Sequence, residues 1–235
     1  MMTECFFGYL IAKKAIHHMP EDRSSVKETD MGVKRKVGIM GGTFDPIHIG
    51  HLLIAEQACQ QFDLEKVLFM PAGNPPHKQN RKGRATNEQR VTMTGMAIAD
   101  NPHFELSMLE MHAKGYSYTY LTLEKLKEKH PDTEYYFIIG ADSLYDFKGW
   151  CMPERICACA TILVATRNHT DENLLRYEME MNSQWFHGRF EELCIDNIDI
   201  SSQQLRKWIK EGRSVRYYTP DSVIAYIEKE HIYKL

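Results

Sequence analysis

The chain has 235 residues, of which 43% are hydrophobic, and its formal net charge at pH 7 is −3. This composition supports one sizeable core. It lacks the basic excess that binding to double-stranded nucleic acid or to an anionic membrane usually requires, so neither is an expected partner. The six cysteines include no Cys-x-x-Cys pair, and we therefore expect reduced thiols, no metal site and a cytoplasmic protein.

Residues 1–30 differ in character from the rest of the chain. An apolar run at residues 5–12 is too short to span a bilayer, which takes about 20 residues. Lys13 and Lys14 follow this run, whereas a secretory signal carries its positive charges before the apolar stretch. We expect neither export nor membrane insertion.

The first structured stretch is predicted to be a strand, a tight glycine turn and a helix. The apolar run 36–40 reads as a buried strand, and apolar residues recur at helical spacing from Leu52 to Phe62. Between them stands Gly41-Gly42-Thr43-Phe44-Asp45-Pro46-Ile47-His48-Ile49-Gly50-His51. Glycines allow a close backbone approach, and a helix start offers free N–H groups to phosphate.

Two histidines strengthen the prediction of a phosphate site. His48 and His51 are three residues apart at a helix start, so both rings point to one side. A transition metal would need further ligands, and the sequence offers none at a familiar spacing. The alternative is an ordinary turn followed by a surface helix that happens to begin with two histidines.

The motif Gly-Thr-Phe-Asp-Pro-x-His-x-Gly-His resembles the opening of the nucleotidylyltransferase superfamily, and in particular that of bacterial nicotinate-nucleotide adenylyltransferases. The resemblance covers residues 36–233 and implies that Gly41, Gly42, Thr43 and Phe44 hold ATP, with His48 and His51 on its phosphates. Residues 48–51 also spell the motif of class I aminoacyl-tRNA synthetases. No Lys-Met-Ser-Lys-Ser-like segment follows, and we reject that reading. Chains of the resembling family begin shortly before the first strand, so we interpret 31–235 as one domain and 1–30 as a flexible extension or an over-extended start.

The second predicted strand, 66–72, leads into a loop that contains Asn74 and Lys78. In open α/β sheets ligands gather at the carboxyl ends of strands, although a solvated proline-rich loop is an equal alternative on physical grounds. The resemblance places Lys78 near phosphate and Asn74 near a mononucleotide. Thr86 begins a capping-box pattern that predicts a helix to about residue 100. On it, Arg90 resembles a family arginine that faces the site, with a solvated arginine as the alternative.

Further strands are predicted at 104–107 and at 135–139, the second of them central, with a helix from Ser117-Tyr118-Thr119 to Lys129 between them. Gly140 and Asp142 follow the central strand, where a carboxylate can meet ribose hydroxyls or Mg²⁺; the alternative is a helix cap. By resemblance, Thr119 lies near the nicotinate carboxylate, Trp150 stacks on the pyridine ring and the backbone N–H of Cys151 meets the carboxylate. From the residues alone, Thr119 is as apt as a plain helix cap and Trp150 as core packing.

A strand is expected at 161–165, a helix within 168–190, and a last short strand at 193–195. By resemblance Arg167 lies at the rim of the site. Ser201 and Ser202 open a helix that carries Arg206 one turn later, a pattern suited to clamping an anion. It resembles a family motif on the ATP triphosphate, although Gln203 replaces the usual threonine. A closing helix is expected within 219–231.

These elements predict a doubly wound, Rossmann-like and mostly parallel α/β sheet of about six strands. The resemblance implies adenylyl transfer from ATP to nicotinate mononucleotide with Mg²⁺, and His48, His51 and Arg206 as the catalytic residues. Nicotinamide mononucleotide or phosphopantetheine as acceptor, and a nucleotide-binding protein without turnover, stay open as alternatives. A homo-oligomer also stays open.

Overall fold

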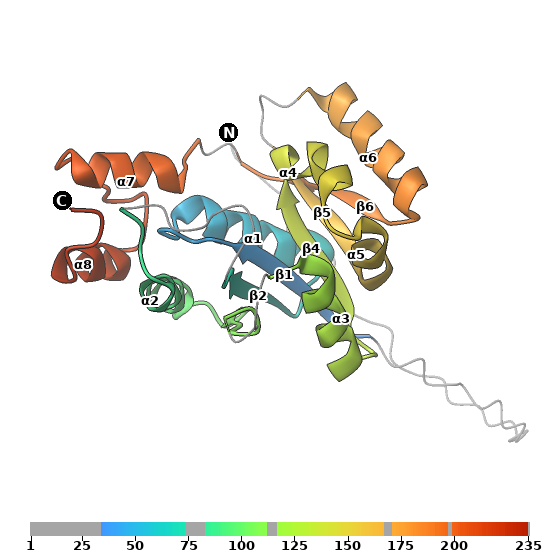
Figure 1. Ribbon diagram of the computed structural model, residues 1–235, viewed down its shortest axis with the longest axis horizontal. Coiled ribbons are helices and arrows are strands. Elements are labelled where there is room, and N and C mark those ends of the chain that lie inside the picture. The colour runs from blue at the N-terminus through green and yellow to red at the C-terminus, as the bar shows by residue number, and fades with distance from the viewer. Residues whose placement is uncertain (1–33, 74–82, 112–116, 167–170, 197–198, 235) are drawn as a thin grey trace, which may run out of the picture. The chain divides into compact units, whose positions relative to one another are not determined.

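The computed structural model describes residues 34–73, 83–111, 117–166, 171–196 and 199–234 (Figure 1). The interpretation of residues 1–30 lies outside these ranges. The strands are β1 (Lys36–Gly42), β2 (Lys66–Pro71), β3 (Phe104–Leu106), β4 (Glu134–Gly140), β5 (Ala160–Thr166) and β6 (Phe190–Cys194). The helices are α1 (Ile49–Phe62), α2 (Asn87–Ile98), α3 (Thr119–Lys129), α4 (Ala141–Tyr145), η1 (Phe147–Gly149), α5 (Pro153–Cys159), α6 (Glu172–Phe186), α7 (Ser202–Lys210) and α8 (Asp221–Lys229).

The strands form one parallel sheet in the order β3-β2-β1-β4-β5-β6. The α/β doubly wound prediction is confirmed, and every strand pair is parallel. Met40 of β1 lies beside Phe69 of β2 and Ile138 of β4 in the register. The chain winds outward from β1 in one direction and from β4 in the other, so the switch point lies between these two central strands.

Helices cover the sheet on both faces, and each face has its own buried cluster. One cluster contains Ala55 of α1, Met93 of α2, Leu205 of α7 and Val223 of α8. The other contains side chains from α3, α4, α5 and α6. Figure 1 shows α2 beside α8, and α5 beside α6. Helices α1, α2, α7 and α8 therefore cover one face of the sheet, and α3, α4, α5 and α6 cover the other.

Local sequence explains most boundaries. Thr86 caps α2 by accepting the Gln89 N–H at 3.2 Å, and the Gln89 side chain accepts the Thr86 N–H at 2.9 Å, as the capping-box pattern predicts. One strand boundary and one helix differ from expectation. The last strand begins at Phe190, three residues before the predicted apolar run, because its first residues alternate between the two sides of an edge strand. Helix α5, which Pro153 opens at its first turn, was not predicted.

Candidate functional site

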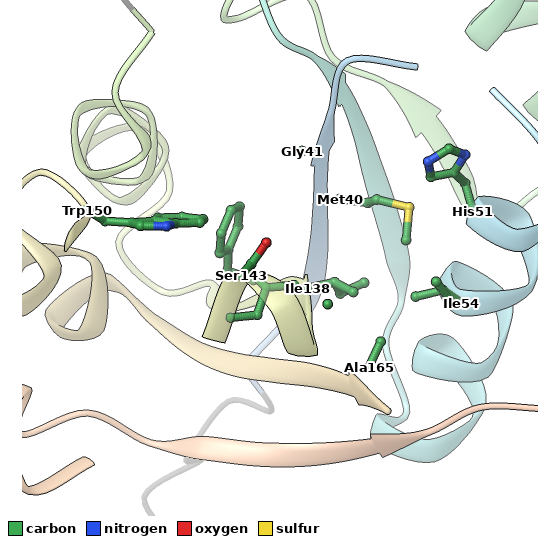
Figure 2. Close-up of a pocket in the computed structure, with 11 residues that line it drawn as sticks. Met40, Gly41, His51, Ile54, Ile138, Ser143, Trp150 and Ala165 are labelled. Carbon is green, nitrogen blue, oxygen red and sulfur yellow. The ribbon is translucent and has the colours of Figure 1, made fainter. Parts of the chain in front are cut away.

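A pocket of about 170 Å³ opens at the carboxyl ends of β1, β4 and β5, at the switch point of the sheet. Its lining residues are Met40, Gly41, His51, Ile54, Phe137, Ile138, Ile139, Gly140, Ser143, Trp150 and Ala165. Figure 2 shows His51 and Trp150 at opposite ends of the pocket, with Gly41 and Ser143 between them. The pocket therefore has one polar end at the start of α1 and one aromatic end beside η1.

The polar end is built on the two predicted histidines. Their rings stack with centroids 3.7 Å apart, so the structure brings them together as the spacing predicted. The His51 Nδ1 atom accepts the backbone N–H of His48 at 3.2 Å. In a neutral ring this bond places the remaining proton on Nε2, which makes that atom a hydrogen-bond donor.

Phe44 packs its ring against the ring of His51. It adopts a left-handed backbone conformation with φ of 48°, and its side chain is 1% exposed. Its ring meets that of His51 edge to face, with centroids 5.1 Å apart. A Cβ atom on Gly42 would lie 2.8 Å from the Phe44 ring, so this packing requires glycine there. Phe44 thus orients a histidine, and its ring does not reach the open side of the pocket.

Side chains from distant elements hold the backbone of the loop between β1 and α1. Four of its carbonyl oxygens each accept a hydrogen bond from a residue far away in the sequence. The pairs are Arg90 to Thr43 (2.7 Å), Arg206 to Asp45, Ser202 to Pro46 (2.8 Å) and Thr219 to Ile47 (2.8 Å). The loop is therefore fixed by the rest of the fold before any ligand binds.

The carboxylate of Asp45 lies at the centre of this arrangement and is 1% exposed. One oxygen, Oδ1, accepts from the Tyr233 hydroxyl at 2.7 Å and from the Ala85 N–H at 3.1 Å. The other, Oδ2, lies 2.9 Å from Arg84 and 3.8 Å from Arg206. A buried charge is tolerated when it is paired and fully hydrogen-bonded, and both conditions are met here.

The predicted anion clamp lies beside the same loop. Ser201 caps α7 by accepting the Gln204 N–H at 3.2 Å, while the Ser202 hydroxyl is engaged with Pro46. The Arg206 side chain is 14% exposed. Burial, followed by the nearby Arg84, lowers the pKa of Arg206. Ser202 and Arg206 thus hold the loop in place, a role that the motif alone did not indicate.

Arg90 is neither solvated nor open to the pocket. Its side chain is nearly buried and donates also to Ala72 and Asn87, each at 2.6 Å. Burial lowers the pKa of this arginine. Arg90 therefore links the residues that directly follow β1 and β2, Thr43 and Ala72, and is not part of the pocket lining.

Aromatic packing forms the other end of the pocket. The Trp150 ring lies 5.3 Å from that of the buried Phe147 and 6.1 Å from that of Phe137. The indole is itself only half-buried, which leaves a flat apolar surface on the pocket side (Figure 2). Such a surface suits a planar ring.

The other predicted residues have mixed outcomes. Gly140 lines the pocket, whereas Asp142 is exposed in the first turn of α4 and Cys151 is exposed after Trp150. Thr119 is the first residue of α3 and is not among the lining residues. Asn74, Lys78 and Arg167 lie outside the described residues.

Sequence reasoning missed six apolar lining residues and one polar one, which are Met40, Ile54, Phe137, Ile138, Ile139, Ala165 and Ser143. Met40, Ile139 and Ala165 stand at the carboxyl ends of predicted strands, which is the signal that could have found them. Ser143 directly follows Asp142, a candidate residue for the ribose.

Among the described residues, no three His, Cys, Asp or Glu side chains come together as a metal-binding group. Nor does any helix in those ranges have the length and apolar content to cross a membrane.

Comparison with known proteins adds the following relationships. A family model described as cytidylyltransferase-like matches residues 39–215. A "Probable nicotinate-nucleotide adenylyltransferase" of Lachnoclostridium phytofermentans is 44% identical over 200 residues, which are 85% of this chain and 99% of that protein. A protein of the same name from Desulfitobacterium hafniense is 40% identical over 201 residues, covering 86% and 97% of the two chains.

Solved structures show the same fold. The nicotinic acid mononucleotide adenylyltransferase of Plasmodium falciparum, complexed with NaAD, superposes with a TM-score of 0.70 at 21% identity. The superposition covers 85% of this chain and 97% of that one.

Proposed function

The chain belongs to the nicotinate-nucleotide adenylyltransferases of the cytidylyltransferase-like family, and from this membership we infer that it transfers the adenylyl group of ATP to nicotinate mononucleotide. The products are deamido-NAD and pyrophosphate, a step of NAD biosynthesis. No covalent enzyme intermediate is needed.

The geometric observation that supports this inference is the two-ended pocket at the switch point. His51, whose ring stacks on that of the buried His48, lies at one end and a half-exposed indole at the other (Figure 2). The reaction transfers the adenylyl group of a polyphosphate, ATP, to a nucleotide with a planar ring, and each end suits one of these two substrates.

In the reaction the phosphate oxygen of nicotinate mononucleotide attacks the α-phosphorus of ATP, and the bond to the pyrophosphate oxygen breaks. Such transfers depend on alignment and on neutralising charge on the phosphates. Because Nδ1 of His51 accepts a hydrogen bond, its Nε2 atom carries the proton, and we assign to this donor, together with His48, the stabilisation of the leaving pyrophosphate.

We assign the remaining ATP contacts to the loop and to the start of α7. The backbone of Gly41, Gly42, Thr43 and Phe44 approaches the nucleotide, and Ser201 with the amides of the α7 start faces the phosphates. Arg206 keeps one N–H on the Asp45 carbonyl and has other N–H groups for phosphate. Gly140 and Asp142 are assigned to the ribose.

For the acceptor we assign the pyridine ring to Trp150 and its carboxylate to Thr119 and the Cys151 N–H. Asn74, Lys78 and Arg167 complete this side in the proposal. The described chain has no carboxylate cluster that would hold Mg²⁺ alone. Mg²⁺ commonly binds through substrate phosphates with few protein ligands, so we propose that it enters with ATP and neutralises phosphate charge. All five cysteines in the described ranges are free, which supports a reducing, cytoplasmic setting.

The test is pyrophosphate release with ATP and Mg²⁺, offering nicotinate mononucleotide, nicotinamide mononucleotide and phosphopantetheine in parallel reactions. We expect a clear preference for the nicotinate form. Preference for another acceptor would keep the chemistry and replace the substrate. ATP binding without pyrophosphate release in any reaction would instead support a nucleotide-binding protein without turnover.

A further inference from the structure

We propose that Tyr233, near the carboxyl end of the chain, is a positioning residue for the phosphate end of the site. It acts through the buried carboxylate of Asp45, which its hydroxyl contacts at 2.7 Å across 188 positions of sequence. The inference rests on the proposed adenylyl transfer, because the loop that Asp45 belongs to contains His48 and leads directly into the first turn of α1, where His51 lies.

The residues that follow α8, 230–234, form the tail of the described chain, and their backbone holds the Tyr233 hydroxyl in position. After α8 ends at Lys229, His231 and Tyr233 adopt left-handed backbone conformations, with φ of 52° and 65°. Non-glycine residues rarely adopt these values, and they persist where surrounding contacts over-determine them. Between them Ile232 is buried, and Tyr233 itself is 8% exposed. The tail therefore ends in a fixed conformation with its tyrosine pointing into the protein.

The two oxygens of Asp45 divide their partners. Oδ1 accepts from Tyr233 and from the Ala85 N–H, whereas Oδ2 faces the guanidinium groups of Arg84 and Arg206. The bonds to Oδ1 set the rotation of the carboxylate plane. They thereby decide where Oδ2 lies, and with it where the two positive groups come to rest.

The orientation of the Asp45 carboxylate matters because two positive groups, Arg84 and Arg206, lie beside it. Arg84 and Arg206 repel each other, and burial with this repulsion lowers the pKa of Arg206. A correctly placed Asp45 holds both cations beside the loop and leaves Arg206 directed at the Asp45 carbonyl. Without the tyrosine hydroxyl, Oδ1 keeps one donor, and the carboxylate can turn toward Arg84. Arg206 then loses its fixed position next to the phosphates.

The hydrogen bond from Tyr233 to Asp45 is not needed for the packing of the tyrosine ring. Burial first, and then the Asp45 charge, raises the pKa of Tyr233, so the group stays a hydroxyl that donates. A phenylalanine would fill the same space, so Tyr233→Phe removes the hydrogen bond and keeps the ring. A substitution that removes one oxygen atom therefore tests the proposal.

The experiment compares steady-state kinetics of the full chain with Tyr233→Phe and with Tyr226→Phe, which makes the same change on a half-buried tyrosine of α8. We expect Tyr233→Phe to lower kcat/KM for ATP by about tenfold, the factor typical of one hydrogen bond to a charged group. KM for nicotinate mononucleotide should stay the same, because Trp150 lies at the other end of the pocket. Tyr226→Phe should match the wild type in every parameter.

Hydrogen exchange supplies a readout that does not depend on turnover. We expect the amides of residues 44–50 to exchange faster in Tyr233→Phe than in the wild type, while those of β4 and β5 are unchanged. Equal kinetics and equal exchange in the two phenylalanine variants would overturn the proposal. An equal rise in KM for ATP and for nicotinate mononucleotide would also overturn it, since it would indicate general destabilisation. If the wild type itself releases no pyrophosphate, the proposed function fails, and exchange still decides whether Tyr233 holds the loop.

Discussion

The two ends of the pocket are built in different ways. At the phosphate end, four carbonyl oxygens and a buried carboxylate of one loop are bound by side chains from α2, α7, the segment before α8 and the tail. At the ring end, Trp150 rests on Phe147 and Phe137 by aromatic contact. Directed hydrogen bonds fix positions closely, whereas apolar contacts fix a surface and tolerate small shifts.

This difference matches the tasks that we assign to the two ends. Phosphate transfer requires alignment of reacting atoms, and small misplacements there cost rate. Recognition of a ring requires a flat apolar area, and its loss costs mainly affinity. Changes at the phosphate end should therefore appear in kcat, and changes at the ring end in KM.

The largest effect is expected for His51→Ala. Loss of one donor to the leaving group should lower kcat by about 10²–10³-fold with little change in KM for nicotinate mononucleotide. The matched control is His103→Ala, an exposed histidine before β3 whose ring contacts the Glu65 carbonyl. Steady-state pyrophosphate release measures both. Wild-type turnover in His51→Ala would remove this residue from the chemistry.

A smaller effect is expected for Trp150→Ala. Loss of the stacking surface should raise KM for nicotinate mononucleotide by about 3–10-fold and leave KM for ATP unchanged. Trp185→Ala, which alters an exposed tryptophan of α6, is the control. If kcat of Trp150→Ala fell as far as that predicted for His51→Ala, the separation of ring binding from phosphate chemistry between the two ends would be wrong.

The smallest effect concerns the thiols near the ring end. Burial raises the pKa of Cys157 to about 12, so this thiol stays protonated and inert toward iodoacetamide at pH 8. Cys151 is exposed and should be alkylated there. We expect nicotinate mononucleotide, but not ATP alone, to slow alkylation of Cys151 several-fold, with the exposed Cys194 as the internal control. Peptide mass spectrometry measures all three, and equal protection of Cys194 would argue against a specific contact.

Local pattern predicted much of the fold. Glycines, a capping box and β-branched runs act over a few residues, so β1, α1, α2 and β4 were found close to their observed bounds. The missed helix α5 is only seven residues long and follows Met152, whose left-handed backbone no short-range pattern announced. Short elements receive most of their stability from tertiary packing.

The site was predicted in its residues more than in its contacts. The histidine pair came from a spacing of three positions, and the structure confirms that the rings lie together. The bonds from Ser202 to Pro46 and from Tyr233 to Asp45 join positions 156 and 188 residues apart. A single sequence contains no local signal for pairs so far apart. Nor does the sequence around a serine show whether its hydroxyl binds a ligand or a backbone carbonyl.

The bonds between the loop after β1 and the end of the chain also bear on how the protein is made. During translation the six strands emerge well before α7, α8 and the tail, and domains can begin to fold as they appear. Contacts of such high sequence separation close late. A nascent chain that stops before residue 200 therefore carries the whole sheet and Arg90 but lacks Ser202, Arg206, Thr219 and Tyr233. The loop after β1 thus acquires most of its side-chain donors only when the last part of the chain has been made.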